Sequence, residues 1–447
     1  MKTKTVVTGA LLAGVVAFLA WRMLRPLEIF SISPRFEYPL TTTRLPPSLH
    51  DLSAQSCGAC HTAVYHEWTT TIHSQAWTDP YFQADWRHEG KKQICLNCHT
   101  PLDRQQKFRV LGFHGGDRWK PILSPNPAFD PALRQQGVTC AACHVRNGVV
   151  YGPYAKLDAP HPIARWNNDN EACIRCHVVN NKHWDVFFRL PPCGTVAEIQ
   201  RSRKRLQLNH QDIETLLHIA PPAMPACPKY SYKVQPGGSV VSLIPRNDGY
   251  GDDIPVRDVA ALNCVQCHMP PVERPLVPGG KPLAGRRHLW RGGHDPRMVK
   301  KALTITFVKT PTSVPDQERY TLTITNTGAE HYIPTGVPDR HLTVTLRVRS
   351  AGGKILKTQT FTLERTVLWR PFIIDLWDTR LRPWQPRRYS LRFSTLLKPR
   401  PAVVEAVVRY WLMDEAHRAR IHYPGPISYV VFREHIPLHG AVASETP

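Results

Sequence analysis

The middle of this 447-residue chain has few of the periodic apolar stretches from which an ordinary hydrophobic core is built. Between residues 51 and 298, prolines, glycines and loop-like sequence are frequent instead. This scarcity excludes a conventional side-chain core in that segment, so another apolar mass has to fill its interior. Acidic residues are also scarce, at 35 Asp and Glu against 57 Lys and Arg, and methionine occurs only six times.

What the sequence does contain is Cys-x-x-Cys followed at once by His, five times. Two thiols three residues apart can reach the two vinyl groups of a porphyrin, while the adjacent His reaches its iron, so the pattern is the attachment motif of a c-type haem. Zinc binding does not explain the pattern, because a zinc site does not require His directly after each cysteine pair. A thioredoxin-like redox pair does not explain it either, because it needs only one motif, in a βαβ context.

The motifs therefore predict five covalently attached haem c groups, whose macrocycles supply the missing apolar mass. The predicted attachment cysteines are Cys57, Cys60, Cys95, Cys98, Cys140, Cys143, Cys173, Cys176, Cys264 and Cys267. The predicted proximal iron ligands are His61, His99, His144, His177 and His268. Two further cysteines, Cys193 and Cys227, form either a disulfide or two free buried thiols.

The N-terminus has the layout of an export signal, with two lysines before an apolar run from Val6 to Ala20. Phe18 occupies the position where a cleavage site after Ala20 would need a small residue, so retention is favoured over cleavage. We expect a signal anchor or transmembrane helix over residues 1–25 and a proline-rich tether over 26–50. Because haem is attached outside the reducing cytosol, the body is expected on the periplasmic side of the cytoplasmic membrane.

After Lys300 the apolar residues alternate with a period of two, as in half-buried strands. Gly, Pro or Asn bounds each run, and the Cys–Trp pattern of antibody domains is absent. The sequence thus predicts an α+β multidomain protein: a haem-wrapping, mostly helix-and-loop domain over 51–298, then an immunoglobulin-like antiparallel β-sandwich over 299–447. The alternating runs are Leu303–Phe307, Leu322–Ile324, Leu342–Val348, Tyr389–Phe393, Val403–Trp411 and Ile427–Phe432.

Several longer stretches resemble the cytochrome c-554-like multihaem family. They read CGACHTAVYHEWTTTIHSQAWTDPYF, CLNCHTPL, GVTCAACH, CVQCHMPP with RRHLWRGGHDPRMV after it, and NTGAEHYIPTGVPDRHL. The resemblance covers nearly all of the chain from about residue 50, and in that family a haem-wrapping region is often followed by a β-rich domain. It implies a periplasmic carrier that relays electrons between quinone-side, nitrogen-oxidising or sulfur-oxidising enzymes and a terminal acceptor.

An iron that serves electron transfer needs a sixth ligand, and methionine is too rare to be the general choice. The resemblance places a distal ligand at His73, whereas His331 lies in a stretch where the family usually has Gly in place of Glu330. His288 and His294 flank the glycine-bearing loop after the fifth motif, and His161 lies between prolines. For each of these the alternative is a solvated or hydrogen-bonded histidine.

The formal charge of +22 favours salt-sensitive binding to an acidic redox partner or to anionic headgroups, while export excludes nucleic acid. No acid/base constellation stands out, so we predict no catalytic residue. The expected function is a membrane-anchored pentahaem electron carrier. The alternatives are an oxidoreductase acting on a small nitrogen or sulfur compound at one five-coordinate haem, and a structural subunit of a larger haem assembly.

Overall fold

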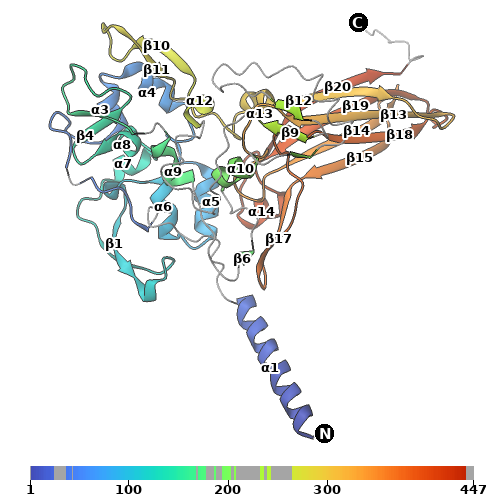
Figure 1. Cartoon of the computed structure of the whole chain (residues 1–447), viewed down its shortest axis with the longest axis horizontal. Helices are drawn as coiled ribbons and strands as arrows, with labels where there is room; N and C mark the ends of the chain where they lie inside the picture. The colour runs from blue at the N-terminus through green and yellow to red at the C-terminus, as the bar shows by residue number, and fades with distance from the viewer. Residues whose placement is uncertain are drawn as a thin grey trace.

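The structure is a computed structural model that describes residues 2–24, 37–42, 44–167, 170–177, 186–187, 194–202, 206–207, 232–235, 239–242 and 264–438. The pairing predicted for Cys193 and Cys227 lies outside these residues, as do residues 26–36 and 43 of the predicted tether. In Figure 1 a helix-rich lobe with short strands lies beside a lobe of long strands, and the N-terminal helix projects from between them.

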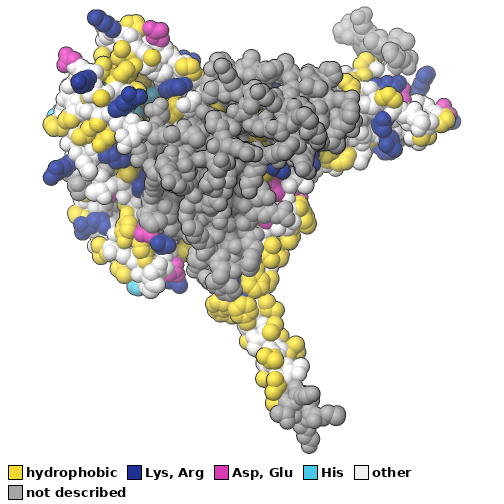
Figure 2. All heavy atoms as spheres, viewed as in Figure 1, with side chains coloured by type: hydrophobic (Ala, Val, Ile, Leu, Met, Phe, Trp, Pro, Cys, Tyr) yellow, Lys and Arg dark blue, Asp and Glu magenta, His cyan; other side chains and the backbone are white. Residues whose placement is uncertain are grey.

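The N-terminal helix α1 (Lys2–Leu24) carries the apolar run. Its window from Val6 to Leu24 has a mean hydropathy of 1.8, and only 6% of that window is buried. By length and composition this helix can cross a membrane, which a signal sequence would also do. Hydrophobic side chains cover its visible length and its junction with the body (Figure 2).

Four of the five predicted attachment motifs lie within short helices, whereas the first begins at the end of the helix Ala54–Gly58 and its His61 is the N-cap residue of the helix Thr62–Thr69. Aspartate caps begin three of the other helices: Asp79, Asp130 and Asp295 each accept hydrogen bonds from first-turn amides, and proline follows each of them. Helix α13 (Pro296–Ala302) packs into the core of the lobe of long strands. The helices of the helix-rich lobe are α3 (Ala54–Gly58), α4 (Thr62–Thr69), α5 (Pro80–His88), α6 (Gln93–His99), η1 (Asp103–Gln105), η2 (His114–Gly116), α7 (Pro131–Gln135), α8 (Cys140–His144), α9 (Glu171–His177), α10 (Thr195–Ser202) and α12 (Cys264–His268).

Short strands add to the helix-and-loop structure predicted for this lobe. They form two-stranded sheets β1–β2 and β10–β11 and three-stranded sheets β3–β4–β5 and β7–β9–β8. The strands are β1 (Phe108–Phe113), β2 (Pro121–Pro125), β3 (Val145–Arg146), β4 (Val149–Gly152), β5 (Ile163–Arg165), β6 (Val186–Phe187), β7 (Leu206–Gln207), β8 (Tyr232–Gln235), β9 (Ser239–Ser242), β10 (Pro271–Pro275) and β11 (Pro282–Arg286).

The C-terminal lobe consists of two antiparallel sheets, β12–β13–β18 and β15–β14–β19–β20. Along β14 buried and half-buried residues alternate strictly, as the period of two predicted. Side chains from both sheets meet in one core, which gives the two-sheet packing of the predicted sandwich; its immunoglobulin-like topology stays a prediction. The strands are β12 (Leu303–Thr310), β13 (Gln317–Asn326), β14 (His341–Ser350), β15 (Ile355–Leu363), β18 (Arg387–Ser394), β19 (Pro401–Trp411) and β20 (Ser428–Pro437).

Three elements of the C-terminal lobe lie outside the predicted alternating runs, and the first of them is strand β15. A hairpin of β16 (Arg365–Leu368) and β17 (Ile373–Asp378) extends toward α1, and β17 pairs with β6 in parallel (Figure 1). Helix α14 (Glu415–Arg420), which the Asp414 side chain caps, interrupts the strands between β19 and β20. It brings an apolar cluster of the C-terminal lobe against Ala84 of α5, so the two lobes share a packed contact.

Candidate haem sites

Four of the five predicted proximal histidines use Nδ1 in the same way. The Nδ1 atoms of His61, His99, His144 and His268 lie 2.5–3.0 Å from the backbone oxygens of Leu276, Ala76, Tyr151 and Arg291, respectively. A carbonyl oxygen can only accept, so each Nδ1 carries the proton and each Nε2 keeps its lone pair. This tautomer and its fixed ring orientation are those of a histidine that binds a metal through Nε2.

Three of the proximal histidines face a second histidine from elsewhere in the chain. The ring centres are 6.5 Å apart for His177 and His73, and 6.0 Å apart for His144 and His288. For His268 and His331 the separation is 6.4 Å, with the rings 11° from parallel. The structure thus brings three predicted distal residues to three of the motifs.

These separations fit an iron between the rings. A metal–imidazole bond is about 2 Å long and the nitrogen lies about 1 Å from the ring centre, so two axial imidazoles have centres roughly 6 Å apart. Burial lowers the pKa of His73 to about 3 and that of His268 and His288 to about 4, which keeps them in the neutral form that binds metal. The residues present therefore fit bis-histidine haem groups at these positions.

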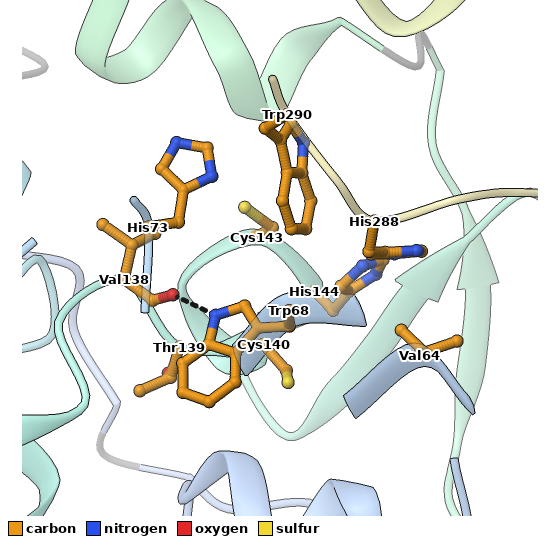
Figure 3. A pocket seen from close by; sticks show the side chains of 10 residues that line it. All are labelled: Val64, Trp68, His73, Val138, Thr139, Cys140, Cys143, His144, His288 and Trp290. Carbon is orange, nitrogen blue, oxygen red and sulfur yellow. Dashed lines mark hydrogen bonds between the residues drawn. The ribbon is translucent and has the colours of Figure 1, made fainter. Parts of the chain in front are cut away.

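A small hollow, partly open to solvent, lies at the third motif (Figure 3). Both thiols of that motif line it together with His144 and His288, and Trp68 and Trp290 form part of its apolar wall. Two thiols, two facing imidazoles and apolar walls are the groups that a covalently bound porphyrin requires.

The position of His288 depends on Glu67 of α4. Glu67 accepts a bidentate pair of hydrogen bonds from Arg274 at 2.8 and 2.7 Å, and one from the backbone amide of His288 at 2.9 Å. Although burial alone would raise the pKa of Glu67, Arg274 and the His288 amide lower it overall, so the carboxylate stays ionised. Glu67 therefore ties the end of the β10–β11 hairpin to α4 and holds His288 opposite His144.

Hydrogen bonds hold the segment that carries His73 against Val138, which lies two residues before the third motif. The Trp68 indole donates to the Val138 carbonyl at 2.8 Å, and the Val138 amide donates to the His73 carbonyl at 2.9 Å (Figure 3 shows the first bond). Gly137 has a φ of +59°, and a Cβ there would lie 2.7 Å from the His73 carbonyl oxygen. A side chain at Gly137 would therefore push this segment away.

The C-terminal lobe supplies His331, and a buried ion network holds its loop. Glu198 of α10 accepts from the Tyr332 amide at 3.2 Å and from Arg380 at 2.6 Å, while Arg380 also pairs with Asp378 at 2.7 Å. Glu198 and Arg380 are almost fully buried. Burial alone lowers the pKa of Arg380, but the two carboxylates outweigh it and raise the pKa overall.

Trp290 lies between two of these histidine pairs. Its ring contacts His73 edge-on with centres 4.9 Å apart, and it contacts His288 at 5.1 Å with the ring planes perpendicular (Figure 3). The backbone of Trp290 has a φ of +40°, which is strained for a bulky residue. One indole therefore restrains the distal histidines of two motifs.

The other two predicted distal residues are placed differently. His294 is exposed, and its Nε2 lies 3.3 Å from a guanidinium nitrogen of Arg340. The Nδ1 of His161 is buried and has no hydrogen-bond partner. In the described part of the chain, the ring stacked on His99 is Phe82, with centres 3.6 Å apart and planes 8° from parallel.

Thiols of different motifs lie close together. The Cys57 thiol lies close enough to Cys140 for Cys140 to lower its pKa, and Cys98 lowers the pKa of the Cys176 thiol in the same way. Cys267 is disulfide-bonded, whereas the nine other cysteines of the described ranges are free. A disulfide sulfur cannot form a thioether at the same time, so attachment through Cys267 stays a prediction that requires this bond to open.

Sequence reasoning did not find Glu67, Trp290, Glu198 or Arg380 as part of these sites. Glu67 lies in the first motif's own stretch, between His66 and Trp68, and no pattern there indicates contact with a distant histidine. The carbonyl oxygens that orient the proximal histidines leave no signal at all, because every residue has one.

Comparison with known proteins agrees with this geometry. Residues 56–114 match the family described as cytochrome c554 and c-prime. No curated protein matches the chain at a significant level. The chain is similar to a crystal structure of a penta-heme cytochrome c552 from Thermochromatium tepidum, with a TM-score of 0.55 and 16% sequence identity, covering 87% of this chain and 99% of that chain.

Two other solved structures share only a small part of the fold. A putative beta-galactosidase from Bacteroides fragilis has a TM-score of 0.16 and 12% identity, covering 30% of this chain and 15% of that chain. The sporulation control protein Spo0M from Bacillus subtilis has a TM-score of 0.14 and 11% identity, covering 31% of this chain and 48% of that chain. Similarity at this level carries no argument about function.

The chain thus has a segment similar to the cytochrome c554 and c-prime family and a fold similar to that of a penta-heme cytochrome. The resemblance to the cytochrome c-554-like family that the sequence motifs indicated is thereby confirmed.

Proposed function

We propose that the protein is a membrane-anchored pentahaem electron carrier that works on the periplasmic side of the cytoplasmic membrane. The observation that carries the proposal is the set of three histidine pairs at 6.0–6.5 Å, each suited to a six-coordinate iron. A bound haem with two axial imidazoles supplies one-electron transfer without an open coordination position.

The thiol contacts support electron transfer between motifs. Motif 1 contacts motif 3 through Cys57 and Cys140, and motif 2 contacts motif 4 through Cys98 and Cys176. Trp290 joins the histidine pairs of motifs 3 and 4. Groups attached at such closely spaced motifs lie within short range of one another, as a relay needs.

The proposed axial pairs are His177 with His73, His144 with His288, and His268 with His331. The two irons at the first and second motifs have the proximal ligands His61 and His99, and the proposed distal residues that remain for them are His161 and His294. The formal charge of +22 supports an acidic redox partner.

Low-temperature EPR of the oxidised full-length protein, combined with a pyridine haemochrome count, tests the proposal. We expect five haems per chain, all low-spin, because two axial imidazoles give a ligand field strong enough to leave ferric iron with a single unpaired electron. A count below five would show that at least one of the five motifs carries no haem. The fifth motif is then examined first, since Cys267 is disulfide-bonded in the structure.

The axial pairs are tested one at a time by His73→Met, His288→Met and His331→Met. Each substitution is expected to raise the midpoint potential of one haem by on the order of 100 mV with the haem count unchanged, since a thioether ligand favours ferrous iron. His341→Met is the matched control, because His341 stacks on Trp411 within the C-terminal lobe. Potentials that do not move in any of the three variants contradict the axial pairs.

One observation favours a second candidate function. The aromatic neighbour of His99 in the described residues is Phe82 rather than a histidine. If the second motif's iron is five-coordinate, the protein is an oxidoreductase for a small nitrogen or sulfur compound. A high-spin EPR signal near one haem in five that changes on adding nitrite or hydroxylamine supports this function over the carrier.

A further inference from the structure

The end of α1 is fixed to the tip of the β16–β17 hairpin. The Arg22 guanidinium donates to the Pro371 carbonyl at 2.9 Å, and Arg370 donates back to the Arg22 carbonyl at 3.0 Å. The rings of Phe18 and Phe372 have centres 6.2 Å apart. Arg22 is only 4% exposed, so this contact is packed rather than a chance approach.

This contact fixes the height of the hairpin relative to a bilayer. The apolar window from Val6 to Leu24 has 19 residues, which at about 1.5 Å per residue span roughly the 30 Å of a hydrocarbon core. The whole window is therefore needed to cross, which places Arg22 near the outer headgroup level and Phe18 about one helical turn deeper, among the upper acyl chains. The hairpin that contacts them has to lie at the same level.

The hairpin presents apolar side chains there. Leu368, Leu376 and Trp377 are 38%, 40% and 51% exposed. Thr366 pairs with Trp377 and Val367 with Asp375, so Leu376 is the extra residue of a β-bulge. Strict alternation would turn one of two successive residues inward, whereas the bulge leaves both Leu376 and Trp377 exposed.

A buried ion pair supports this surface from within. Arg365 and Asp375 form two hydrogen bonds, at 2.7 and 3.0 Å, and their side chains are 0% and 2% exposed. Tryptophan is one of the two residues enriched at membrane–water interfaces, and exposed apolar residues gathered on one element mark an interaction site. Figure 2 shows hydrophobic side chains gathered where α1 meets the body.

We infer that the β16–β17 hairpin is a second lipid-contact element, which inserts Leu368, Leu376 and Trp377 among headgroups and upper acyl chains beside α1. The inference rests on the proposed membrane anchor. It gives the body one orientation on the bilayer, because two contacts restrict the tilt that a single helix would allow.

Photocrosslinking in nanodiscs of phosphatidylcholine and phosphatidylglycerol with alkyne-tagged acyl chains tests the inference. p-Benzoylphenylalanine is placed in the full-length protein at Trp377, at Leu12 of α1, or at Leu396, and each variant is first checked for the wild-type haem count. Leu12 and Leu396 are 67% and 69% exposed, so they serve as the anchor control and the body control. We expect lipid adducts at Leu12 and Trp377, on the order of tenfold above those at Leu396.

The outcomes separate the two proposals. Adducts at Leu12 without adducts at Trp377 overturn the hairpin contact and leave the anchor intact. Adducts at none of the positions overturn both. A crosslink from Trp377 to a second copy of the chain also overturns the inference, because the hairpin surface is then a protein interface.

Discussion

The β-rich lobe gathers twenty buried hydrophobic residues into one continuous core, whereas the buried hydrophobic residues described in the haem-binding lobe fall into clusters such as one of six and one of three. The first lobe contains long strands whose inward side chains meet across two sheets. The second contains short helices that each present a motif. Side chains alone can therefore stabilise one lobe, while the other would depend on the proposed covalently attached haem groups for apolar contact.

The largest expected effect comes from removing haem. A variant in which the third motif carries Cys140→Ser and Cys143→Ser loses the group at the hollow between His144 and His288. We expect amide protection across residues 51–177 to fall by several kcal/mol, because no side-chain core replaces the lost contact. Protection in strands β13, β14 and β19 should stay unchanged. Hydrogen exchange read by mass spectrometry measures both lobes in one sample.

A core substitution in the other lobe is the control for this comparison. Leu346→Ala removes a fully buried side chain from the C-terminal core and should lower the free energy of unfolding of that lobe by about 3 kcal/mol. The haem spectrum should be unaltered. If the haem-depleted variant loses protection equally in both lobes, their cores are not independent and the comparison fails.

The second effect concerns the ion network between the lobes. Arg380→Ala leaves the carboxylates of Glu198 and Asp378 buried without their partner, which should cost about 3–5 kcal/mol in the free energy of unfolding. Because Glu198 also holds the amide of Tyr332, we further expect the potential of one haem, that of the fifth motif, to shift. Denaturant unfolding and a redox titration measure the two effects.

An exposed ion pair provides the matched control for the network. Lys309 lies 2.8 Å from Glu318, but its side chain is 55% exposed. Lys309→Ala should therefore change stability by less than about 1 kcal/mol. Equal losses in the two variants would show that burial does not decide the strength of the Glu198–Arg380 contact.

The smallest effect depends on pH. His417 of α14 hydrogen-bonds Asp339 at 2.9 Å and Asp85 of α5 at 3.0 Å, and these two aspartates raise its pKa to about 10 against burial. A guanidinium nitrogen of Arg420 lies 3.2 Å from Nδ1 of His417, and its positive charge disfavours protonation of the histidine. Because the pKa is higher in the folded state, the stabilisation is complete below the ordinary pKa near 6.5 and is lost as pH rises toward 10.

The measurement compares wild type with His417→Gln by denaturant unfolding across that range. The difference should be about 2 kcal/mol at pH 6 and should vanish near pH 10. A difference that stays constant over this range would show that His417 contributes by packing and not by its charge.

The local features of both lobes could be predicted from the sequence. The alternation from Leu342 to Val348 indicated a strand, and β14 covers it. Each attachment motif is local as well, since its cysteines and histidine are within five residues. The hairpin β16–β17 was missed because its bulge breaks the period of two, and α14 was missed because six residues contain too few turns to show a helical period.

The amino-acid sequence predicts the chemistry of attachment, the apolar N-terminal helix and the alternation of the C-terminal strands, because residues close in the chain encode each of them. Which histidine faces which motif follows from the tertiary structure alone: His73 lies about 100 residues before the fourth motif and His331 lies in the other lobe, yet each faces a proximal histidine. Their positions follow from backbone hydrogen bonds and from charges such as Glu67 and Glu198, whose partners lie 134 to 221 residues away. Contacts at such separations arise from packing of the whole chain, and no local pattern records them.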